Sequence, residues 1–407
     1  MVPEMRNHAT VKPIDNPAAL ILSAGYSQRM GRFKPLLPLG DGSVVERVVA
    51  LHRGCSVNHI LVVTGHEAAT LRAAMGGLAV QWVLNSAHDK GMFSSILAGL
   101  RALPEDCDAF FVHPVDIPLV RSQTIRQLLA AGGNQPESVI HPVFAGRRGH
   151  PPLIRADLRP QILQWSGRDG LRGFLQRHDA NSVEIPVADE GVLLDLDTPE
   201  DYRSLLAKAA REGVPSNAEC RMLMEQIVAL PEAVIYHCRA VATVAQVITT
   251  ALNAAGGRLD AELVYAAALL HDIGRTRKTH AQIGAQLLNA HGFGCLSPIV
   301  RVHMDISLAD REGVDAAQVV FLADKLVSGD RRVDLVQRFD AKMVKYGHDS
   351  AAAAQIARRR ENATHILARV ESLTGRTLGD ILNAAGLLSG ERICSCPGIP
   401  EPAAGPF

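Results

Sequence analysis

The chain has 407 residues. This length is too great for one ordinary hydrophobic core and fits two domains of roughly 150 to 200 residues each. Hydrophobic residues make up 47% and charged residues 21%, the proportions of a soluble globular protein. Lys and Arg total 42 and Asp and Glu also total 42, so no net charge attracts nucleic acid or a membrane, and a small-molecule substrate is expected.

Both ends of the chain are predicted to be flexible. The leader, residues 1–16, lacks the apolar core of a signal peptide, and no apolar run elsewhere is long enough for a membrane span. Seven cysteines without disulfide-like spacing favour a reducing compartment, so a cytoplasmic location is expected. Cys394 and Cys396 lie in the predicted tail, residues 389–407, where a soft-metal or redox role and a frayed terminus both stay open.

Between residues 17 and 206, short runs rich in Val, Ile and Leu alternate with helix-like segments. This pattern is typical of a parallel sheet covered by helices on both faces, and it predicts an open, Rossmann-like three-layer α/β domain. The predicted strands are 19–22, 59–64, 80–84, 109–113, 138–144, 182–187 and 192–196.

The first predicted strand runs into the sequence LILSAGYSQRMGRFKPLLPL, residues 20–39. Gly25 permits a positive φ and is expected to let backbone N–H groups approach phosphate oxygens. Arg29 and Lys34 then provide charge for a triphosphate and its pyrophosphate leaving group. A tight turn with a solvated basic rim is the alternative, but glycine, both cations and PLLPL in one stretch favour a phosphate site.

Further segments follow in order: GMFSSILAGL, HPVDIPLV, GRRGHPPLI, SGRDGLRGFL and DLDTPEDY. The residues that stand out in them are Gly91, Ser94, Ser95, Asp116, His150, Asp195 and Asp197. With the first loop, these segments resemble the MobA-like nucleotidyltransferase family over residues 18–206. The resemblance implies a nucleotide site made by Ser23, Ala24, Gly25, Arg29, Lys34, Ser94 and Ser95.

Within that family, the first loop is closer to the cytidylyltransferases that build molybdopterin cytosine dinucleotide than to the guanylyltransferases, which show LAGG. Two positions depart from the pattern, since Ser23 replaces the usual alanine and Phe93 a usual serine. The implied reaction is attack of the molybdopterin phosphate on the α-phosphorus of CTP, or of another nucleoside triphosphate, with release of pyrophosphate. A sugar phosphate or another alcohol phosphate is the alternative acceptor, and a molybdoenzyme or its chaperone is the implied protein partner.

The resemblance implies Mg²⁺ held by Asp116 and Asp197, whose hard oxygen ligands suit that ion. The alternatives are a turn aspartate at Asp116 and the N-cap of the helix in TPEDYRSLL at Asp197. Catalytic roles then fall to Arg29, Lys34 and Asp116. For His150, contact with a substrate phosphate and simple filling of a loop both stay open.

After Asp201 the alternation stops, and Gly, Pro, Ser and Asn cluster in a predicted linker, residues 207–218. Residues 219–388 are predicted to form an all-helical domain. Positions 237, 241, 244, 248 and 252 share one face of a helix that ends near Gly256. The sequence DAELVYAAALLHDIG predicts a second, buried helix that stops at Gly274.

His237, the pair His271-Asp272 and Asp324 form an H…HD…D series in this half. A helix that ends in His-Asp aims two adjacent side chains at one ion because the chain leaves helical geometry there. Buried histidines in Ala-rich helices are often structural, but four positions in this order favour a metal. The series resembles the HD superfamily of phosphohydrolases, in its HDIG form, over residues 220–345, and implies a catalytic role for Asp272.

His280 and His303 fall where some subgroups place ligands for a second metal, with a polar rim of the cleft as the alternative. Mixed nitrogen and oxygen ligands favour Mn²⁺, Fe²⁺, Co²⁺ or Zn²⁺. Lys325 is expected to bind substrate phosphates, whereas the charged run Arg275, Arg277 and Lys278 is expected to be solvated. A regulatory nucleotide-binding module is the alternative to a hydrolase of a phosphate ester or nucleotide, and the presence of all four core ligands favours the hydrolase.

Overall fold

The computed structural model describes residues 14–133, 139–275, 279–308 and 313–393. The chain divides into two compact units, residues 1–212 and 213–407, and the dividing point lies within the predicted linker 207–218. Most of the predicted leader, most of the predicted tail with Cys394 and Cys396, and the pair Arg277 and Lys278 lie outside the described residues.

The described parts of the predicted flexible ends are anchored. The backbone N–H groups of Asp15 and Asn16 both donate to Asp108 Oδ2, at 3.1 and 3.0 Å. At the other end, the N–H of Ile393 donates to the carbonyl of Asp330 at 2.9 Å. These long-range backbone hydrogen bonds leave no local sequence pattern, so they could not be read from the sequence.

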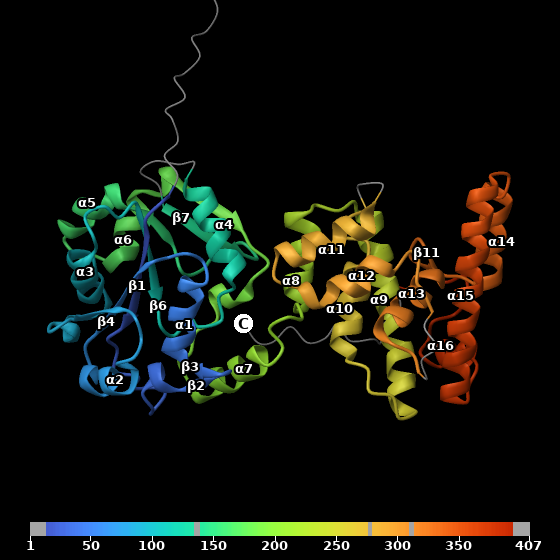
Figure 1. The fold of residues 1–407 in the computed structure, drawn as a ribbon, viewed down its shortest axis with the longest axis horizontal. Coiled ribbons are helices and arrows are strands. Elements are labelled where there is room, and N and C mark those ends of the chain that lie inside the picture. The colour runs from blue at the N-terminus through green and yellow to red at the C-terminus, as the bar shows by residue number, and fades with distance from the viewer. Residues whose placement is uncertain (1–13, 134–138, 276–278, 309–312, 394–407) are drawn as a thin grey trace, which may run out of the picture. The chain divides into compact units, whose positions relative to one another are not determined.

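The first unit contains a three-layer α/β fold around a mixed sheet, drawn in blue to green in Figure 1. The strand order is β10–β7–β9–β6–β1–β4–β5, and β8 pairs with β7. The strands are β1 Pro17–Ser23, β4 His59–Thr64, β5 Gln81–Leu84, β6 Ala109–Pro114, β7 Val139–Phe144, β8 Arg147–Arg148, β9 Leu153–Arg155 and β10 Ser182–Pro186, with the small β2 Pro38–Leu39 and β3 Gly42–Ser43 pair outside the sheet.

The prediction of a wholly parallel sheet is wrong at β8 and β9. Strand β9 runs antiparallel between β6 and β7, whereas β1, β4, β5 and β6 are parallel to their neighbours in the other half of the sheet. Both missed strands have three residues or fewer, too few for a period-2 pattern to be recognised in the sequence.

The predicted strand 192–196 is also wrong. Glu190–Leu193 form a 3-10 turn, and the residues from there up to Leu196 belong to no strand. Val192 and Leu196 are fully buried. Their apolar side chains therefore reflect burial of a loop against the sheet, which resembles a short buried strand in the sequence.

Helices cover both faces of the sheet, and β1 shows why. Leu20 and Leu22 lie in one core with helices α3, α5 and α6, whereas Ile21 between them lies in the other with α1, α2 and α7. This alternation follows from the two-residue period of a strand. The helices are α1 Val44–Arg53, α2 Ala68–Met75, α3 Met92–Ala102, α4 Ser122–Gly132, α5 Arg159–Leu163, α6 Gly170–Arg177 and α7 Pro199–Ala209.

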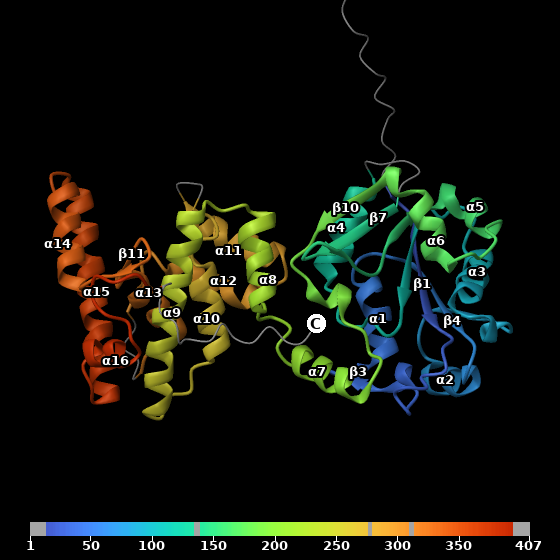
Figure 2. The ribbon, with the colours of Figure 1, turned by 180° about the vertical axis from the view of Figure 1, so that it is seen from behind.

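The second unit is helical, as predicted. The central helix α9, Glu232–Ala254, packs against four other helices of the unit, and Figure 2 shows it beside α10. The others are α8 Asn217–Arg221, α10 Ala261–Leu270, α11 His280–Ala290, α12 Ser297–Val302, α13 Ala316–Lys325, α14 Leu335–Tyr346, α15 Ser350–Thr374 and α16 Leu378–Ala384, with a π-helical segment at Met222–Ile227 and a short hairpin of β11 Val327–Ser328 and β12 Arg331–Arg332.

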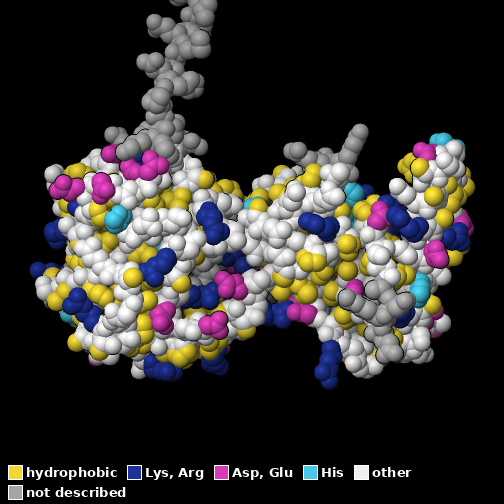
Figure 3. Space-filling view, viewed as in Figure 1, with side chains coloured by type: hydrophobic (Ala, Val, Ile, Leu, Met, Phe, Trp, Pro, Cys, Tyr) yellow, Lys and Arg dark blue, Asp and Glu magenta, His cyan; other side chains and the backbone are white. Residues whose placement is uncertain are grey.

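The surface carries charges of both signs. Figure 3 shows Lys and Arg interspersed with Asp and Glu over the face that it draws, in keeping with equal numbers of the two in the sequence. Among the described helices, none combines the length and the apolar character needed to cross a bilayer.

Two histidines lie buried side by side in the first unit. His113 Nε2 donates to the carbonyl of Ile117 at 2.9 Å, so its Nδ1 is free to accept from His52 Nε2 at 2.8 Å. Both rings are neutral in this arrangement. Burial lowers the pKa of His113 to about 4 and takes that of His52 well below its usual value.

We expect the first unit to lose stability as the pH falls from 6.5 towards 4. The unfolded chain binds a proton on His113 near pH 6.5, whereas the folded chain resists protonation until about pH 4. Its contribution is complete above pH 6.5 and decreases by about 1.4 kcal/mol per pH unit below it. Both tryptophans, Trp82 and Trp165, lie in this unit, so urea unfolding followed by tryptophan fluorescence measures it separately. A His113→Asn variant with an unchanged pH slope would contradict this assignment.

Candidate active sites

The loop after β1 turns at Ser27. The carbonyl of Ser27 accepts hydrogen bonds from the N–H groups of Met30 and Gly31, both at 3.2 Å, and Ser27 Oγ accepts one from the N–H of Lys34 at 3.2 Å. The residues with positive φ are Ser27 and Gly31. The positive φ that glycine permits is therefore not used at Gly25, because the sharp turn comes two residues later.

Gly25 nevertheless lies where a phosphate can approach. A Cβ added at Gly25 would meet no atom within 4 Å, so its backbone faces open space. The two residues before it, Ser23 and Ala24, are buried, and Ser23 Oγ has no hydrogen-bond partner among the described residues. A buried hydroxyl at the end of a strand, next to an accessible backbone, fits the predicted contact with a nucleotide.

Two cations and two carboxylates meet beside this loop. Lys34 Nζ lies 2.7 Å from Asp197 Oδ1 and 3.5 Å from Asp116 Oδ2, and Arg29 Nη1 lies 3.1 Å from Asp197 Oδ2. The hydrogen bond from Lys34 lowers the pKa of Asp197 below its usual range. The structure thus brings together all four charged residues that the sequence assigned to this site, although they are up to 168 positions apart.

Asp197 does not cap the following helix. The N-cap of α7 is Thr198, whose side chain accepts from the N–H of Asp201 in a capping box. Asp116 follows β6, and its carbonyl accepts from the N–H of Leu196 at 2.8 Å, which holds the two acidic segments side by side. Two carboxylates directed at one cation fit Mg²⁺, which binds proteins through few carboxylates and completes its shell with substrate phosphates.

Asp195 is a third acid at this position that the sequence analysis left without a role. Its residue is exposed, yet the packing around the carboxyl raises its pKa, as do the charges of Asp116 and Asp197. The shift is consistent with three acids grouped in a small space. Asp195 lies near Asp116 because the N–H of the next residue, Leu196, donates to the carbonyl of Asp116.

Ser94 and Ser95 are organised by Asn85, which sequence reasoning missed. Asn85 Nδ2 donates to Ser94 Oγ at 2.8 Å and to Ser95 Oγ at 3.0 Å. Its Oδ1 accepts from the N–H of Ala87 at 3.0 Å. Asn85 therefore fixes the loop between β5 and α3. A polar residue directly after a predicted strand was the only sequence signal for it.

His150 lies near the same acids. Its side chain is exposed, yet the packing around the ring lowers its pKa, while the charge of Asp116 acts in the opposite direction. Its N–H donates to the carbonyl of Val192 at 2.8 Å. A Cβ at Gly149 would lie 2.5 Å from the Val192 side chain, so the chain passes this point only with glycine. His150 is thus held at the edge of the site.

In the second unit, the H…HD…D residues converge. His271 and Asp272 lie in the turn after α10 ends at Leu270, His237 comes from α9 and Asp324 from α13, and all four are buried. His237 Nε2 lies 3.2 Å from Asp324 Oδ1 and 3.8 Å from Asp272 Oδ2, and His271 Nε2 lies 3.5 Å from Asp272 Oδ2. Three helices therefore direct four side chains at one point.

The orientation of the rings fits a metal ion. The Nδ1 atoms of His237, His271 and His303 donate to the carbonyls of Gly329, Ala268 and Val300, at 2.9, 2.7 and 2.7 Å. A neutral imidazole that donates from Nδ1 presents a lone pair at Nε2. His271 Nε2 and His303 Nε2 are buried without a hydrogen-bond partner among the described residues. Lone pairs that face carboxylates in this way form a set of ligand atoms that suits a metal cation.

Asp272 uses its two oxygens in different directions. Oδ2 faces His237 and His271, whereas Oδ1 lies 3.3 Å from both His280 Nε2 and His303 Nε2. The possible ligand atoms form two groups, His237, His271 and Asp272, and Asp272, His280 and His303. Asp272 is thus placed to bridge two ions. Burial raises its pKa, but His271, His303 and Arg275 lower it more, so the carboxylate is ionised.

Gly274 explains how His280 reaches this site. A Cβ at Gly274 would lie 2.3 Å from the carbonyl oxygen of His280, so the HDIG turn and the start of α11 touch only because this residue is glycine. Arg275 is exposed, as expected, and it also donates to Asp272 Oδ2. This ion pair could not be read from the sequence because charged runs are usually exposed.

Lys325 lies in the interior. It is 2% exposed, and its ammonium lies 2.5 Å from Asp324 Oδ2 and 3.2 Å from the carbonyl of His303. This position gives no support to the predicted contact with substrate phosphates. The geometry instead makes Lys325 a cation that holds Asp324 ionised, which agrees with the lowered pKa of that carboxyl.

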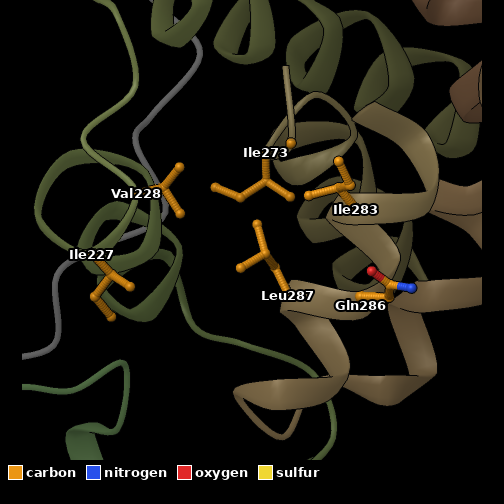
Figure 4. Close-up of a pocket in the computed structure, with 7 residues that line it drawn as sticks. Ile227, Val228, Ile273, Ile283, Gln286 and Leu287 are labelled. Carbon is orange, nitrogen blue, oxygen red and sulfur yellow. The ribbon is translucent and has the colours of Figure 1, made fainter. Parts of the chain in front are cut away.

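A cavity of about 400 Å³ lies beside the HDIG turn. Figure 4 shows Val228 facing Ile273 and Leu287 across it, with Ile283 and Gln286 on the same side as Ile273. Ile273 directly follows Asp272, so the cavity wall is continuous with the histidine–aspartate cluster. No ionisable side chain is among the described lining residues of the cavity.

Comparison with known proteins finds a family match in each half of the chain. Residues 19–182 match the MobA-like NTP transferase domain and residues 234–329 the HD domain. The molybdenum cofactor cytidylyltransferase of Escherichia coli K12 is 29% identical over 187 residues, 45% of this chain and 92% of that protein. The nicotine blue oxidoreductase of Paenarthrobacter nicotinovorans is 31% identical over 198 residues, 46% of this chain and 95% of that protein.

Among solved structures, a nucleotidyl transferase from Methanothermobacter thermautotroptrophicus is 24% identical with a TM-score of 0.43, and the match covers 48% of this chain and 99% of that one. The family matches confirm both resemblances drawn from the sequence. The chain belongs to the MobA-like NTP transferase family through its N-terminal domain and carries an HD domain in its C-terminal half.

Proposed function

We propose that the N-terminal domain transfers CMP from CTP to the phosphate of molybdopterin and releases pyrophosphate. The observation that carries this proposal is the convergence of Arg29 and Lys34 with Asp116 and Asp197 beside the open backbone of Gly25. The similarity to a molybdenum cofactor cytidylyltransferase supports the choice of substrates.

In this proposal the cationic and the acidic residues have different roles. Lys34 and Arg29 neutralise the triphosphate and the departing pyrophosphate, while Asp116 and Asp197 hold Mg²⁺, which supplies charge between the reacting phosphates when bound. No protein nucleophile is needed. An oxygen of the acceptor phosphate forms the bond to the α-phosphorus as the bond to the pyrophosphate oxygen breaks. Ser94 and Ser95, fixed by Asn85, position the base and ribose, and His150 contacts the acceptor phosphate.

We propose further that the HD domain is a hydrolase of a phosphate ester or nucleotide. His237, His271, Asp272 and Asp324 hold a first divalent transition metal, Mn²⁺, Fe²⁺, Co²⁺ or Zn²⁺, and Asp272, His280 and His303 hold a second. Such an ion supplies Lewis acidity and lowers the pKa of water at the site. Asp272 would contribute a ligand atom to both groups, and Lys325 and Arg275 keep the two carboxylates charged.

The two domains act, in this proposal, as separate catalysts within residues 17–206 and 219–388, in the cytoplasm, with a molybdoenzyme or its chaperone as recipient of the cofactor. Each metal site is assembled from residues of one compact unit. If the HD domain is instead a regulatory module, nucleotides will bind to it and alter transfer without being hydrolysed.

The transferase proposal predicts selectivity for CTP. With molybdopterin as acceptor, kcat/KM for CTP should exceed that for GTP by at least about 10-fold, because one or two base-specific hydrogen bonds account for about 1.4 kcal/mol or more. Pyrophosphate release, measured with each nucleotide and with a sugar phosphate as competing acceptor, tests this. Equal use of GTP would refute the base assignment, and faster transfer to the sugar phosphate would refute the acceptor.

A further inference from the structure

Three cations near the metal centre come from outside the segment that matches the HD domain, which ends at residue 329. Arg338 and Lys342 lie on α14, and Arg359 lies on α15. The helix α15 packs against both α13 and α9, which carry Asp324 and His237. The helical pair α14 and α15 therefore adds positive charge to a site whose ligands come from the rest of the domain.

Arg338 is the residue of this group that reaches the ligands. Its Nη2 lies 3.7 Å from Asp324 Oδ1, and its side chain is only 13% exposed. Its Nε and Nη1 atoms have no hydrogen-bond partner among the described residues. A buried guanidinium with unpaired donors is costly, and its planar fork matches the geometry of a phosphate group.

The contact with Asp324 does not by itself account for the burial of the Arg338 guanidinium. Lys325 provides this carboxylate with a closer cation, at 2.5 Å from Oδ2. One carboxylate oxygen at 3.7 Å is also a weak partner for a guanidinium that carries five N–H donors. The remaining donors of Arg338 are thus available to an anion that binds at the metal centre.

Lys342 continues the positive charge along the same face of α14. It lies four residues after Arg338, one turn further along the helix. It is partly buried, and burial together with the charges of Arg338 and Lys325 lowers its pKa to about 8. Arg338 and Lys342 thus place two cations one helical turn apart on the same face of α14, and Arg338 lies beside Asp324.

Arg359 fixes this arrangement. Its Nε and Nη2 donate to the two oxygens of Asp305, at 2.9 and 2.6 Å, and Asp305 follows the metal ligand His303 by two residues. A two-point ion pair of this kind sets orientation as well as distance. The α14–α15 pair is therefore tied to the ligand segment, which keeps Arg338 and Lys342 beside the site.

We propose that Arg338 and Lys342 form a second phosphate subsite, so that the substrate of the HD domain carries two linked phosphate groups, as in a nucleoside di- or polyphosphate. One phosphate lies at the metal centre and the next contacts Arg338 and Lys342. This inference rests on the proposed hydrolase function of the same domain. It names the class of substrate that the fold of the HD domain alone leaves open.

The test measures binding of imidodiphosphate, a diphosphate with a nitrogen bridge that is not hydrolysed, against orthophosphate. The full chain is used with Lys34→Ala, which weakens anion binding in the N-terminal domain, and is saturated with Mn²⁺ with the bound metal quantified. By titration calorimetry, imidodiphosphate should bind at least about 10-fold more tightly than orthophosphate, because it adds charge-assisted hydrogen bonds at the second subsite.

Arg338→Gln and Lys342→Gln should each weaken imidodiphosphate by about 10-fold and leave orthophosphate within about 2-fold, since each removes a cation from the second subsite only. The matched control is Arg360→Gln on the same pair of helices. Arg360 is 42% exposed and pairs with Asp340 at 2.8 Å on α14, so its loss should change neither affinity. Lys342→Gln carries the test if Arg338→Gln does not fold.

Two results would overturn the proposal. Selectivity for imidodiphosphate that survives in both variants would show that these cations do not contact the anion. An equal loss of both anions together with bound Mn²⁺ would show that Arg338 only holds Asp324. If the wild-type protein hydrolyses no phosphate compound but its selectivity depends on Arg338, the hydrolase function is wrong and the subsite stands.

Discussion

Replacing Asp272 by Ala is expected to remove the transition metal from the HD domain and to reduce its phosphatase activity by at least about 100-fold, more than the loss of an outer-shell partner. Asp272 is the single residue common to both groups of ligand atoms. Its removal takes one ligand from each group and also removes the carboxylate oxygen that faces Nε2 of His280 and His303. Metal analysis of the purified protein and hydrolysis of a nucleotide panel measure the two effects.

Asp272→Asn separates charge from shape, because it keeps the size of the side chain and should lose nearly as much metal. The matched control is Asp340→Asn, since Asp340 is 58% exposed and pairs only with Arg360 among the described residues. Nucleotidyl transfer should stay within about 2-fold in all three variants, because a change that affects neither substrate nor transition state leaves kcat/KM unaltered. Full metal content in Asp272→Ala would refute the metal centre, and loss of transfer would show that the domains are coupled.

Replacing Lys34 by Ala should reduce kcat/KM for nucleotidyl transfer by about 100-fold to 1,000-fold, the usual loss when one preorganised charge or donor at the reacting group is removed. The side chain of Lys34 is 12% exposed and its Nζ lies between Asp116 and Asp197, so these contacts hold the ammonium group in a fixed position. Asp116→Asn should cause a similar loss, because it removes one of the two carboxylates proposed for Mg²⁺.

Both variants should remain folded, since the side chains of Asp116 and Asp197 are 30% and 39% exposed and such ion pairs add at most about 1 kcal/mol to stability. Arg32→Ala is the control for Lys34→Ala. Arg32 is an exposed cation in the same loop, two residues away, and its loss changes net charge equally. If Arg32→Ala slows transfer as much as Lys34→Ala, the effect is one of general charge and the role assigned to Lys34 is wrong.

The sequence by itself determined the elements whose signal is local. The runs that became β1, β4 and β6 were recognised because a short, continuous apolar segment between turn residues is typical of a buried strand. The helix α9 was recognised from the 3.6-residue spacing of its buried positions. Both families were identified from the order of short segments, such as the loop with Lys34 and the pair His271-Asp272, which needs no knowledge of distances.

Only the tertiary structure decided what depends on contacts between distant segments. The antiparallel insertion of β9 between β6 and β7 and the burial of Val192 beside Gly149 both depend on contacts between distant segments, which local propensity does not encode. Three further contacts also join distant segments or buried positions that the sequence did not reveal. They are the hydrogen bond from Asn85 to Ser94, the burial of Lys325 against Asp324, and the position of Arg338 beside Asp324. The sequence gives the chemical type of each side chain, but the packing of helices and strands decides which partner it contacts. That packing is the sum of many weak long-range contacts.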